Sequence, residues 1–281
     1  MPDPSIPTIR LPSGVEMPVF GLGTWRMGES ARRRSDEVAA LRHGLERGVR
    51  LIDTAEMYGD GEAEAIVADA VGNRCDEIFI VSKVLPNNAS RRGIVAACER
   101  SLKRLKTGRI DLYLLHWRGS SPLADIVAAF EELRAAGKIL GWGVSNLDRD
   151  DMQELLGVRH GRNCQTDQVL YNLTRRGIEF DLLPFCRKNK MPVMAYSPIE
   201  QGRMLSHKAL AEVAARHGAT PAQVALAWLL HQGVIVIPKA TVLAHVDEDL
   251  GALDLKLTAA DFAALDRAFP PPNSPQPLDM L

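Results

Sequence analysis

Four side chains that together could move a proton follow apolar runs in the first half of the sequence: Asp53, Tyr58, Lys83 and His116. Asp53 ends the Leu-Ile pair in LIDTAEMYGDGEAEA, and Tyr58 follows five residues later. A phenol with a pKa near ~10 is a poor acid at neutral pH, but a neighbouring ammonium, here Lys83, would lower that pKa. Asp53 would hold Lys83 charged in a partly buried ion pair, and His116 would point an N–H at a carbonyl oxygen. These residues predict a site that protonates an oxygen as it becomes an alcohol, with hydride supplied from elsewhere.

Eight short apolar runs, rich in valine and isoleucine, alternate with stretches of helical period along nearly the whole chain. The runs span residues 19–24, 50–54, 78–84, 110–116, 139–145, 165–170, 192–197 and 234–238. The helical stretches include SDEVAALRHGLERG, GEAEAIVADAVG, GIVAACERSLKRL, PLADIVAAFEELRAAG and PAQVALAWLLHQG. Several open on Ser, Asp or Pro and close on Gly, as helix caps require. The pattern predicts an α/β protein, a single (β/α)8 TIM barrel over residues 1–281, because strands covered on both faces are apolar throughout.

The segments outside the eight units predict additions to this barrel. TIRLPSGVEMPVF, ahead of the first barrel strand, is typical of a β-hairpin around Pro-Ser-Gly that plugs the bottom of the barrel. HVDEDLGAL and AADFAALDRAF predict two extra C-terminal helices, followed by the proline-rich tail PPPNSPQPLDML. The structural alternative is an open, doubly wound sheet, but no G-x-G-x-x-G follows the first strand, which counts against it.

Polar residues end seven of the predicted strands, where barrel enzymes carry their chemistry. These ends are Asp53, Lys83, His116, Ser145-Asn146, Gln168, Tyr196-Ser197 and Lys239. Any one of them has a simpler explanation, since such residues also cap helices, hydrogen-bond within the scaffold or pair with an opposite charge. Seven together favour a shared site, because burying so many polar groups is costly unless something organises them.

Composition excludes several other classes of protein. Lys and Arg number 34 against 35 Asp and Glu, so we expect no binding to nucleic acid or to a membrane. The four cysteines lack CxxC spacing and nearby histidines, so we expect reduced thiols and no metal site. No apolar run reaches the ~18 residues of a spanning helix, and no signal peptide is recognisable. We therefore expect a cytoplasmic protein, and a monomer that acts on a small molecule.

Seven stretches resemble the aldo-keto reductase family, in the family's order and along essentially the whole chain from GLGTW to IPKA. They are LIDTAEMYGDGEAE, IVSKV, SLKRLKTGRIDLYLLHW, GWGVSN, DQVLY, MAYSP and VIPKA. The resemblance implies an NADPH-dependent reduction of aldehydes or ketones to alcohols without a metal, on a (β/α)8 barrel closed below by an N-terminal hairpin. It also implies that Tyr58 is the general acid, that Lys83 and Asp53 tune it, and that His116 orients the carbonyl.

The same resemblance implies a larger set of cofactor and substrate contacts. Tyr196 would stack on the nicotinamide ring, and its carboxamide would be held by Ser145, Asn146 and Gln168, with Asp53 beside them. Gly23, Thr24 and Trp25 match the loop at the nicotinamide ribose, Ser197 matches a pyrophosphate contact, and Glu248 matches an adenine contact. Trp25 and Trp117 would line an apolar substrate pocket. Core packing is the alternative role for Trp25, Trp117 and Tyr196.

Departures from the family pattern concentrate where the family binds the 2′-phosphate of NADP. Ala240 replaces the usual serine after IPK, His245 replaces an arginine, and Asp249 replaces an asparagine beside the adenine. Arginine offers a fixed fork to phosphate, whereas histidine carries full charge only below a pKa of ~6.5. A preference for NADPH over NADH therefore depends mainly on Lys239, and use of NADH stays open.

The loops near the substrate also depart from the pattern. Arg118 follows His116-Trp117 where proline is common, and the connections RGSSP and IEQGRML are short. Short loops indicate an open pocket suited to small or varied carbonyls, most like the bacterial subgroup associated with methylglyoxal and other small dicarbonyls. Arg118 would attract a substrate carboxylate, or it is simply an exposed loop arginine.

Three other functions remain as alternatives. A class I aldolase also uses a barrel-strand lysine, with Lys83 as the Schiff-base nucleophile, but it leaves Tyr196, Ser197, Ser145, Asn146 and Gln168 without a role. A metal-dependent hydrolase needs clustered ligands, and the first strand ends in Gly-Thr-Trp. A non-catalytic NADP(H)-binding redox sensor would bind cofactor without turnover.

Overall fold

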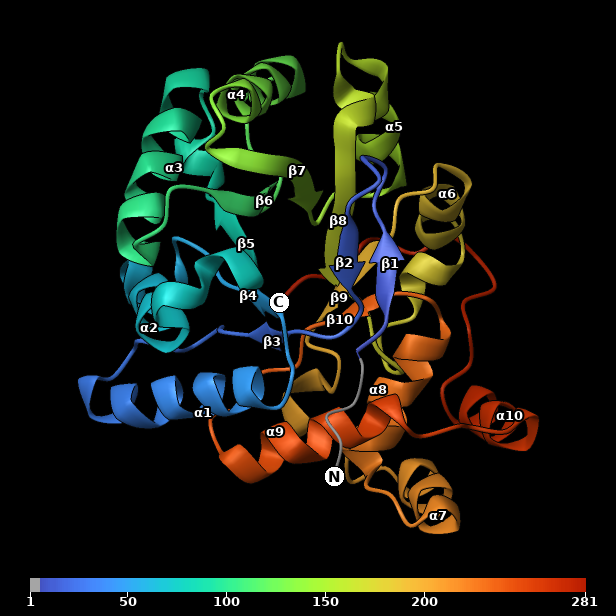
Figure 1. Cartoon of the computed structure of the whole chain (residues 1–281). Coiled ribbons are helices and arrows are strands. Elements are labelled where there is room, and N and C mark those ends of the chain that lie inside the picture. The colour runs from blue at the N-terminus through green and yellow to red at the C-terminus, as the bar shows by residue number, and fades with distance from the viewer. Residues whose placement is uncertain (1–5) are drawn as a thin grey trace.

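A computed structural model of the chain describes residues 6–281 and contains one eight-stranded parallel sheet. Its strands follow one another in sequence order: β3 (Leu22–Gly23), β4 (Leu51–Asp53), β5 (Phe79–Val84), β6 (Ile110–Leu115), β7 (Ile139–Ser145), β8 (Cys164–Leu170), β9 (Val193–Tyr196) and β10 (Ile235–Val236). A parallel bridge between Phe20 and Val236 joins the first strand to the last. The sheet therefore closes on itself, and the predicted (β/α)8 barrel is confirmed (Figure 1).

β3 and β10, the first and last strands of the barrel, have two residues each and meet along a seam. Gly21 N donates to Val236 O, Val236 N to Val19 O, and Gly23 N to Pro238 O, each at 2.9 Å. The two segments approach so closely that a Cβ on Gly23 would lie 2.8 Å from Ile237 O, so only glycine fits there. The first and last strands are thus held in contact at the rim.

Ten α-helices lie within residues 6–281 and surround the barrel (Figure 1). They are α1 (Arg34–Glu46), α2 (Glu62–Val71), α3 (Arg91–Leu105), α4 (Leu123–Ala135), α5 (Arg149–Gly157), α6 (Leu182–Lys188), α7 (Lys208–His217), α8 (Pro221–His231), α9 (Leu243–Leu250) and α10 (Ala259–Ala268). The five quoted helical stretches correspond to α1 to α4 and α8, and the two C-terminal helices to α9 and α10. Capping boxes at Thr220 and Thr258 begin α8 and α10.

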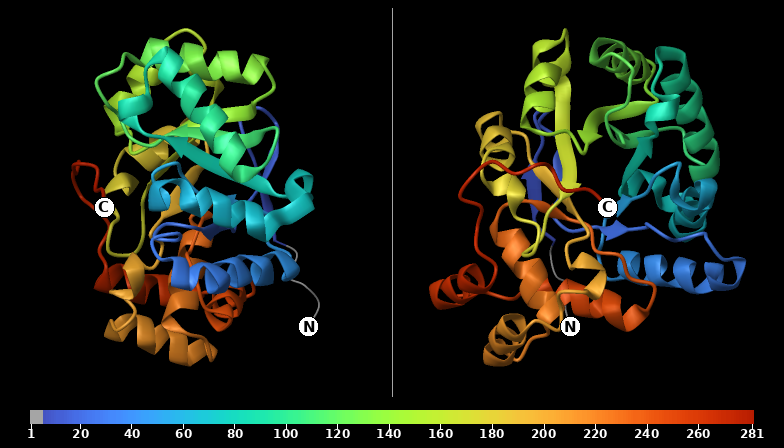
Figure 2. Two further views of the ribbon diagram at one scale, coloured as in Figure 1. Left: turned by 90° about the vertical axis from the view of Figure 1, so that its left-hand side faces the viewer. Right: turned by 180° about the vertical axis from the view of Figure 1, so that it is seen from behind.

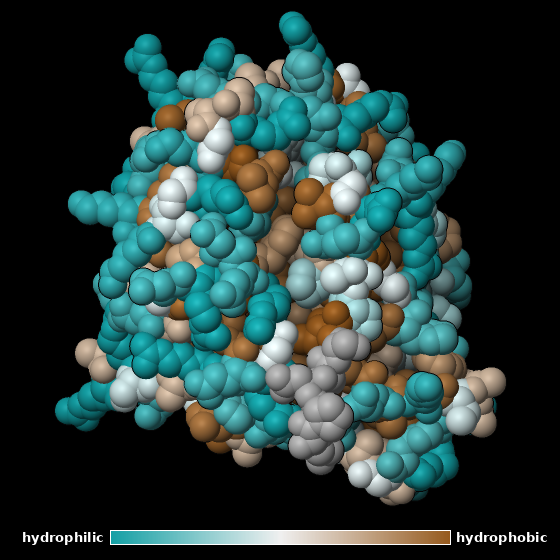
Figure 3. Space-filling view, in the orientation of Figure 1, coloured by the Kyte–Doolittle hydropathy of each residue, from teal (hydrophilic) through white to brown (hydrophobic). Residues whose placement is uncertain are grey.

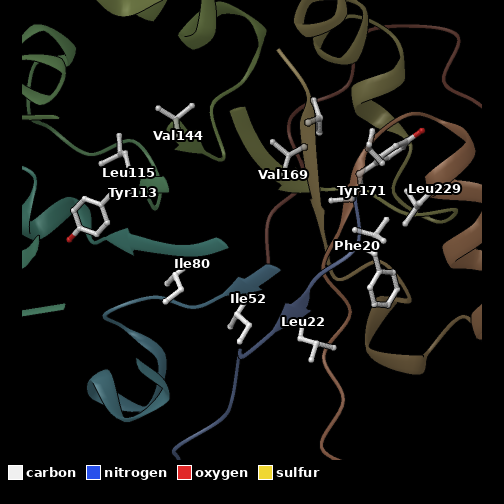
Figure 4. Close-up of a cluster of buried hydrophobic side chains, with 14 of the residues drawn as sticks. Phe20, Leu22, Ile52, Ile80, Tyr113, Leu115, Val144, Val169, Tyr171 and Leu229 are labelled. Carbon is white, nitrogen blue, oxygen red and sulfur yellow. The ribbon is translucent and has the colours of Figure 1, made fainter. Parts of the chain in front are cut away.

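Alternation along the strands divides the core into two layers. Inward residues such as Leu51, Val81 and Leu112 form one cluster inside the barrel. Their neighbours, among them Ile52 and Ile80, point outward into the layer between the strands and the helices (Figure 4). Because alternate residues face opposite sides of a strand, the inward set continues into polar residues at the carboxyl ends of the strands. This alternation therefore brings the predicted site residues together at the end of the barrel formed by the carboxyl ends of the strands.

The N-terminal hairpin closes the opposite end of the barrel, as predicted. β1 (Thr8–Arg10) pairs antiparallel with β2 (Glu16–Pro18), in front of the strands in Figure 1. Leu11 and Met17 are buried in the same cluster as the inward strand residues. Ser13 N donates to Gln165 Oε1 at 2.9 Å, which ties the turn to β8. The barrel floor is therefore apolar and sealed.

Residues 270–281 leave α10 and cross the other end of the barrel. The view from behind in Figure 2 shows this segment running over the fold to the middle of the barrel. Leu278 packs against the outer core cluster, and Met280 and Leu281 line the cavity at the carboxyl ends of the strands. The sequence carried no prediction for the path of this tail.

Polar side chains cover most of the face that carries the hairpin (Figure 3). Val15, Leu140 and Phe180 are large apolar residues exposed singly, whereas Met57, Met280 and Leu281, which are also exposed, line one cavity. Within residues 6–281, no helix has both the length and the apolar character needed to cross a bilayer.

Candidate active site

The carboxyl ends of the strands open into a cavity of about 530 Å³. All but two of the site residues predicted from sequence line it: Gly23, Trp25, Asp53, Tyr58, His116, Trp117, Ser145, Asn146, Gln168, Tyr196, Ser197, Lys239, His245, Glu248 and Asp249. The two others lie behind its wall. Thr24 is fully buried and donates through Oγ1 to Asp53 O at 3.0 Å, and Lys83 is fully buried beneath Asp53 and Tyr58.

Lys83 is the centre of the polar group at the bottom of the cavity. Its Nζ lies 2.7 Å from Asp53 Oδ2, 2.9 Å from Thr54 O and 3.2 Å from the Tyr58 hydroxyl. Burial lowers the pKa of Lys83, and the Asp53 carboxylate opposes this change. All three donor directions of the ammonium are used, so its position is fixed.

Tyr58 reaches this group from the loop after β4. It begins a short 3-10 helix, Tyr58–Gly61, in which Asp60 adopts a left-handed backbone with φ of 54°. Burial raises the pKa of the Tyr58 hydroxyl well above its usual value, and the Asp53 charge adds to the effect. The net shift is therefore upward, opposite to the direction expected from the Lys83 ammonium alone. The Asp53 carboxylate, 2.7 Å from the ammonium, cancels much of its field, so burial dominates.

His116 lies edge-on to Tyr58, with ring centroids 5.7 Å apart. Burial lowers the pKa of His116 to about 2, and the Lys83 charge acts in the same direction. The imidazole is thus neutral at any physiological pH. One ring nitrogen then donates a hydrogen bond and the other accepts one. Its Nδ1 is buried without a hydrogen-bond partner within the described residues.

A chain of hydrogen bonds connects the proton site to the polar residues on β7, β8 and β9. Gln168 Nε2 donates to Asp53 Oδ1 at 2.7 Å, and Ser145 Oγ donates to Gln168 O at 2.7 Å. Asn146 Nδ2 donates to Ser145 Oγ at 3.1 Å, and the Tyr196 hydroxyl donates to Asn146 Oδ1 at 2.9 Å. Asp53 therefore uses one oxygen for Lys83 and the other for this chain.

Lys239 also lines the cavity and has charged groups near it. Burial lowers the pKa of Lys239, while the Glu37 charge raises it and the Arg33 charge lowers it. Lys239 makes no ion pair with another residue between 6 and 281. Burial raises the pKa of Asp249, another residue of the cavity lining, to about 7, and the Glu248 charge contributes. The cavity lining thus offers an ammonium to an anionic ligand, and it also contains carboxyl groups that can accept hydrogen bonds.

Arg118 is committed to other partners. It donates to both carboxylate oxygens of Glu154, at 2.8 and 3.0 Å, and also pairs with Asp151. Both acids are on α5, and Arg118 is not part of the cavity lining. The structure therefore favours the alternative in which Arg118 is a loop arginine over a contact for a substrate carboxylate.

Several cavity residues were missed by the sequence analysis. Arg26 and Met57 adjoin predicted residues, so position alone could have suggested them. Ile199, Gln201 and Gly202 come from the loop after β9, and Met280 and Leu281 come from the tail. The sequence analysis singled out IEQGRML only for its short length, and it assigned the tail no place near the site. Only their packing in three dimensions identifies them.

Comparisons with known proteins agree with this architecture. The sequence profile of the Aldo/keto reductase family matches residues 19–269, a range that includes all eight barrel strands. The chain is 51% identical over 279 residues to "Methylglyoxal reductase YeaE" of Escherichia coli (strain K12), covering 97% of this chain and 98% of that protein. It is 34% identical to "Glyoxal reductase" of Bacillus subtilis (strain 168), covering 95% of this chain and 94% of that protein.

A crystal structure of an aldo/keto reductase from Klebsiella pneumoniae, in complex with NADP and acetate, superposes with a TM-score of 0.95. That protein is 48% identical, and the match covers 98% of this chain and 99% of the other. A second structure from the same organism, in complex with NADPH, gives the same TM-score and identity.

Proposed function

The chain belongs to the aldo/keto reductase family, and on that premise we propose that it reduces small aldehydes, ketones or dicarbonyls such as methylglyoxal with NADPH. One observation carries the proposal: the fully buried Lys83 ammonium contacts Asp53 and the Tyr58 hydroxyl together, at the bottom of a cavity. That arrangement delivers a proton to an oxygen and then stabilises the phenolate left behind. The NADP- and NADPH-bound relatives from Klebsiella pneumoniae support the choice of cofactor.

The residues lining the cavity fit a dinucleotide. Ser145, Asn146 and Gln168 offer hydroxyl and amide groups at one end, where a carboxamide would be held, and Tyr196 offers an aromatic ring. Lys239 offers positive charge elsewhere in the lining, where a phosphate would be held. When bound there, NADPH supplies the hydride for the carbonyl carbon.

The chain's own residues then handle the carbonyl oxygen. The raised pKa of Tyr58 keeps it protonated, so it is available as a donor. As hydride reaches the carbon, the oxygen gains negative charge and takes the Tyr58 proton, which forms the alcohol. Lys83 stabilises the phenolate, and Asp53 keeps Lys83 charged. The neutral His116 donates an N–H to the carbonyl oxygen and so orients it.

The burial of Lys83 argues against the class I aldolase. A Schiff-base lysine must reach the substrate carbonyl, whereas Lys83 does not line the cavity and uses all its donors on protein atoms. Borohydride treatment in the presence of a carbonyl substrate should therefore leave Lys83 unmodified.

The direct test follows nicotinamide absorbance with methylglyoxal and simple aldehydes, in parallel with NADPH and NADH. We expect turnover with NADPH well above that with NADH. Turnover with NADH alone would keep the chemistry and contradict the cofactor assignment. Cofactor binding without turnover on any carbonyl would favour the redox sensor instead.

Replacing Lys239 with alanine should weaken the binding of NADPH far more than the binding of NADH. Loss of a charge-assisted contact to the 2′-phosphate is expected to lower NADPH affinity by a factor on the order of 10 to 100. NADH lacks that phosphate and should bind nearly as before. Binding titrations followed by protein fluorescence would measure both, with Lys208→Ala on the exposed face of α7 as the control. Equal losses for the two cofactors would contradict a 2′-phosphate contact.

A further inference from the structure

Two segments that carry no sequence motif meet at the cavity. The loop after β9 contributes Ile199, Gln201 and Gly202, and the tail contributes Met280 and Leu281. The side chains of Met280 and Leu281 are about half exposed, at 49% and 51%, so they form a wall with one face open. Contacts of Glu200 and Arg175 hold this wall against the rest of the site.

Glu200 fixes the loop after β9. It is 5% exposed, and its backbone is left-handed with φ of 50°. It accepts hydrogen bonds from Asn172 Nδ2 at 2.8 Å and from Arg203 at 2.7 Å. Asn172 also donates to Ser197 O at 2.9 Å. The loop conformation is thus tied to a nearly buried carboxylate.

Arg175 joins this carboxylate to the tail. Its NH2 group lies 3.3 Å from Glu200 Oε1, and its NH1 group lies 3.5 Å from Asp279 Oδ1. Asp279 is the residue immediately before the Met280-Leu281 wall. One guanidinium therefore contacts both segments, and the second contact is exposed enough to be weak in water.

We propose that Arg175 is a positioning residue for substrate size, which holds Met280 and Leu281 as a wall of the carbonyl pocket by bridging Glu200 to Asp279. The inference rests on the proposed carbonyl reduction. Leu278 anchors the tail one residue before Asp279, so loss of the bridge releases the wall and leaves the rest of the tail attached. The pocket should then admit bulkier carbonyls.

Three single substitutions separate this role from a general effect on the loop. Arg175→Ala removes both contacts, and Asp279→Asn removes only the ion pair with the tail. Arg203→Ala is the matched control, because Arg203 also pairs with Glu200 but makes no contact with Asp279. Deletion of Met280 and Leu281 removes the wall itself.

Steady-state kinetics with methylglyoxal and the bulkier phenylglyoxal give the readout. In Arg175→Ala, Asp279→Asn and the deletion, the ratio of kcat/KM for phenylglyoxal to that for methylglyoxal should rise by about fivefold or more, mainly through KM. In Arg203→Ala the ratio should stay within about twofold of wild type. An unchanged ratio in the deletion would show that Met280 and Leu281 are no wall, and an equal shift in Arg203→Ala would show a loop effect; either overturns the proposal.

Amide hydrogen exchange over residues 271–281, measured by mass spectrometry, tests the bridge without activity. Exchange should be faster in Arg175→Ala and Asp279→Asn than in wild type, and unchanged in Arg203→Ala. Unchanged exchange in Arg175→Ala would refute the bridge even if the enzyme reduces carbonyls. A wild-type protein that reduces no carbonyl would instead overturn the proposed function, so the two failures are distinguishable.

Discussion

Replacing Tyr58 with phenylalanine is expected to reduce carbonyl turnover by a factor on the order of 10² or more, the usual scale for loss of a general acid. The substitution removes one oxygen, the atom that Lys83 Nζ contacts at 3.2 Å, and keeps the ring that packs beside His116. Cofactor affinity should stay nearly unchanged. Steady-state turnover with NADPH and a fluorescence titration of the cofactor measure the two quantities separately.

The matched control is Tyr113→Phe. Tyr113 is fully buried but points outward into the layer between barrel and helices, away from the cavity (Figure 4). Loss of the Tyr113 hydroxyl should leave carbonyl turnover close to that of the wild-type protein. A Tyr58→Phe variant with wild-type turnover would remove Tyr58 from the mechanism.

Replacing Lys83 with methionine is expected to cost both activity and stability. Turnover should fall because the phenolate loses its cation, and the free energy of unfolding should fall by about 3–5 kcal/mol because Asp53 becomes an unpaired buried charge. The side chains of Lys83 and Asp53 are 0% and 3% exposed, so water cannot replace the lost partner. Urea unfolding and turnover measured on the same preparation test the two effects.

The double variant Asp53→Asn with Lys83→Met separates the two losses. It removes both charges while residue 53 keeps an oxygen for Gln168, so most of the stability should return. Turnover should stay low, because no cation remains beside Tyr58. Recovery of activity in the double variant, or no recovery of stability, would contradict the role of this ion pair.

Much of the fold was predictable because the barrel repeats one simple pattern. Each strand is an apolar run that ends on a polar residue, and parallel strands in a barrel bring all those ends to one rim. Asp53 and Gln168 are 115 positions apart in sequence, yet their side chains are 2.7 Å apart. Their positions at the ends of two strands are enough to predict this meeting.

Other features could not be predicted because they depend on distances between segments without a pattern. The direction of the Tyr58 pKa follows from how strongly burial competes with an ion pair, which spacing does not reveal. Arg118 is paired by acids on α5, more than thirty positions away. The tail over the cavity is proline-rich and has no periodicity, so its path is set only by contacts such as that of Leu278 with the core.

The seam of the barrel makes the cavity depend on both ends of the chain. Gly23, on the first strand, is held in the cavity wall by contacts with Ile237 and Pro238, which directly follow the last strand. A nascent chain that ends before residue 239 has neither the closed rim nor Lys239, although it already carries Asp53, Tyr58, Lys83 and His116. The four side chains that handle the proton thus come from the first half of the chain, whereas the rim that encloses them is complete only with the last strand.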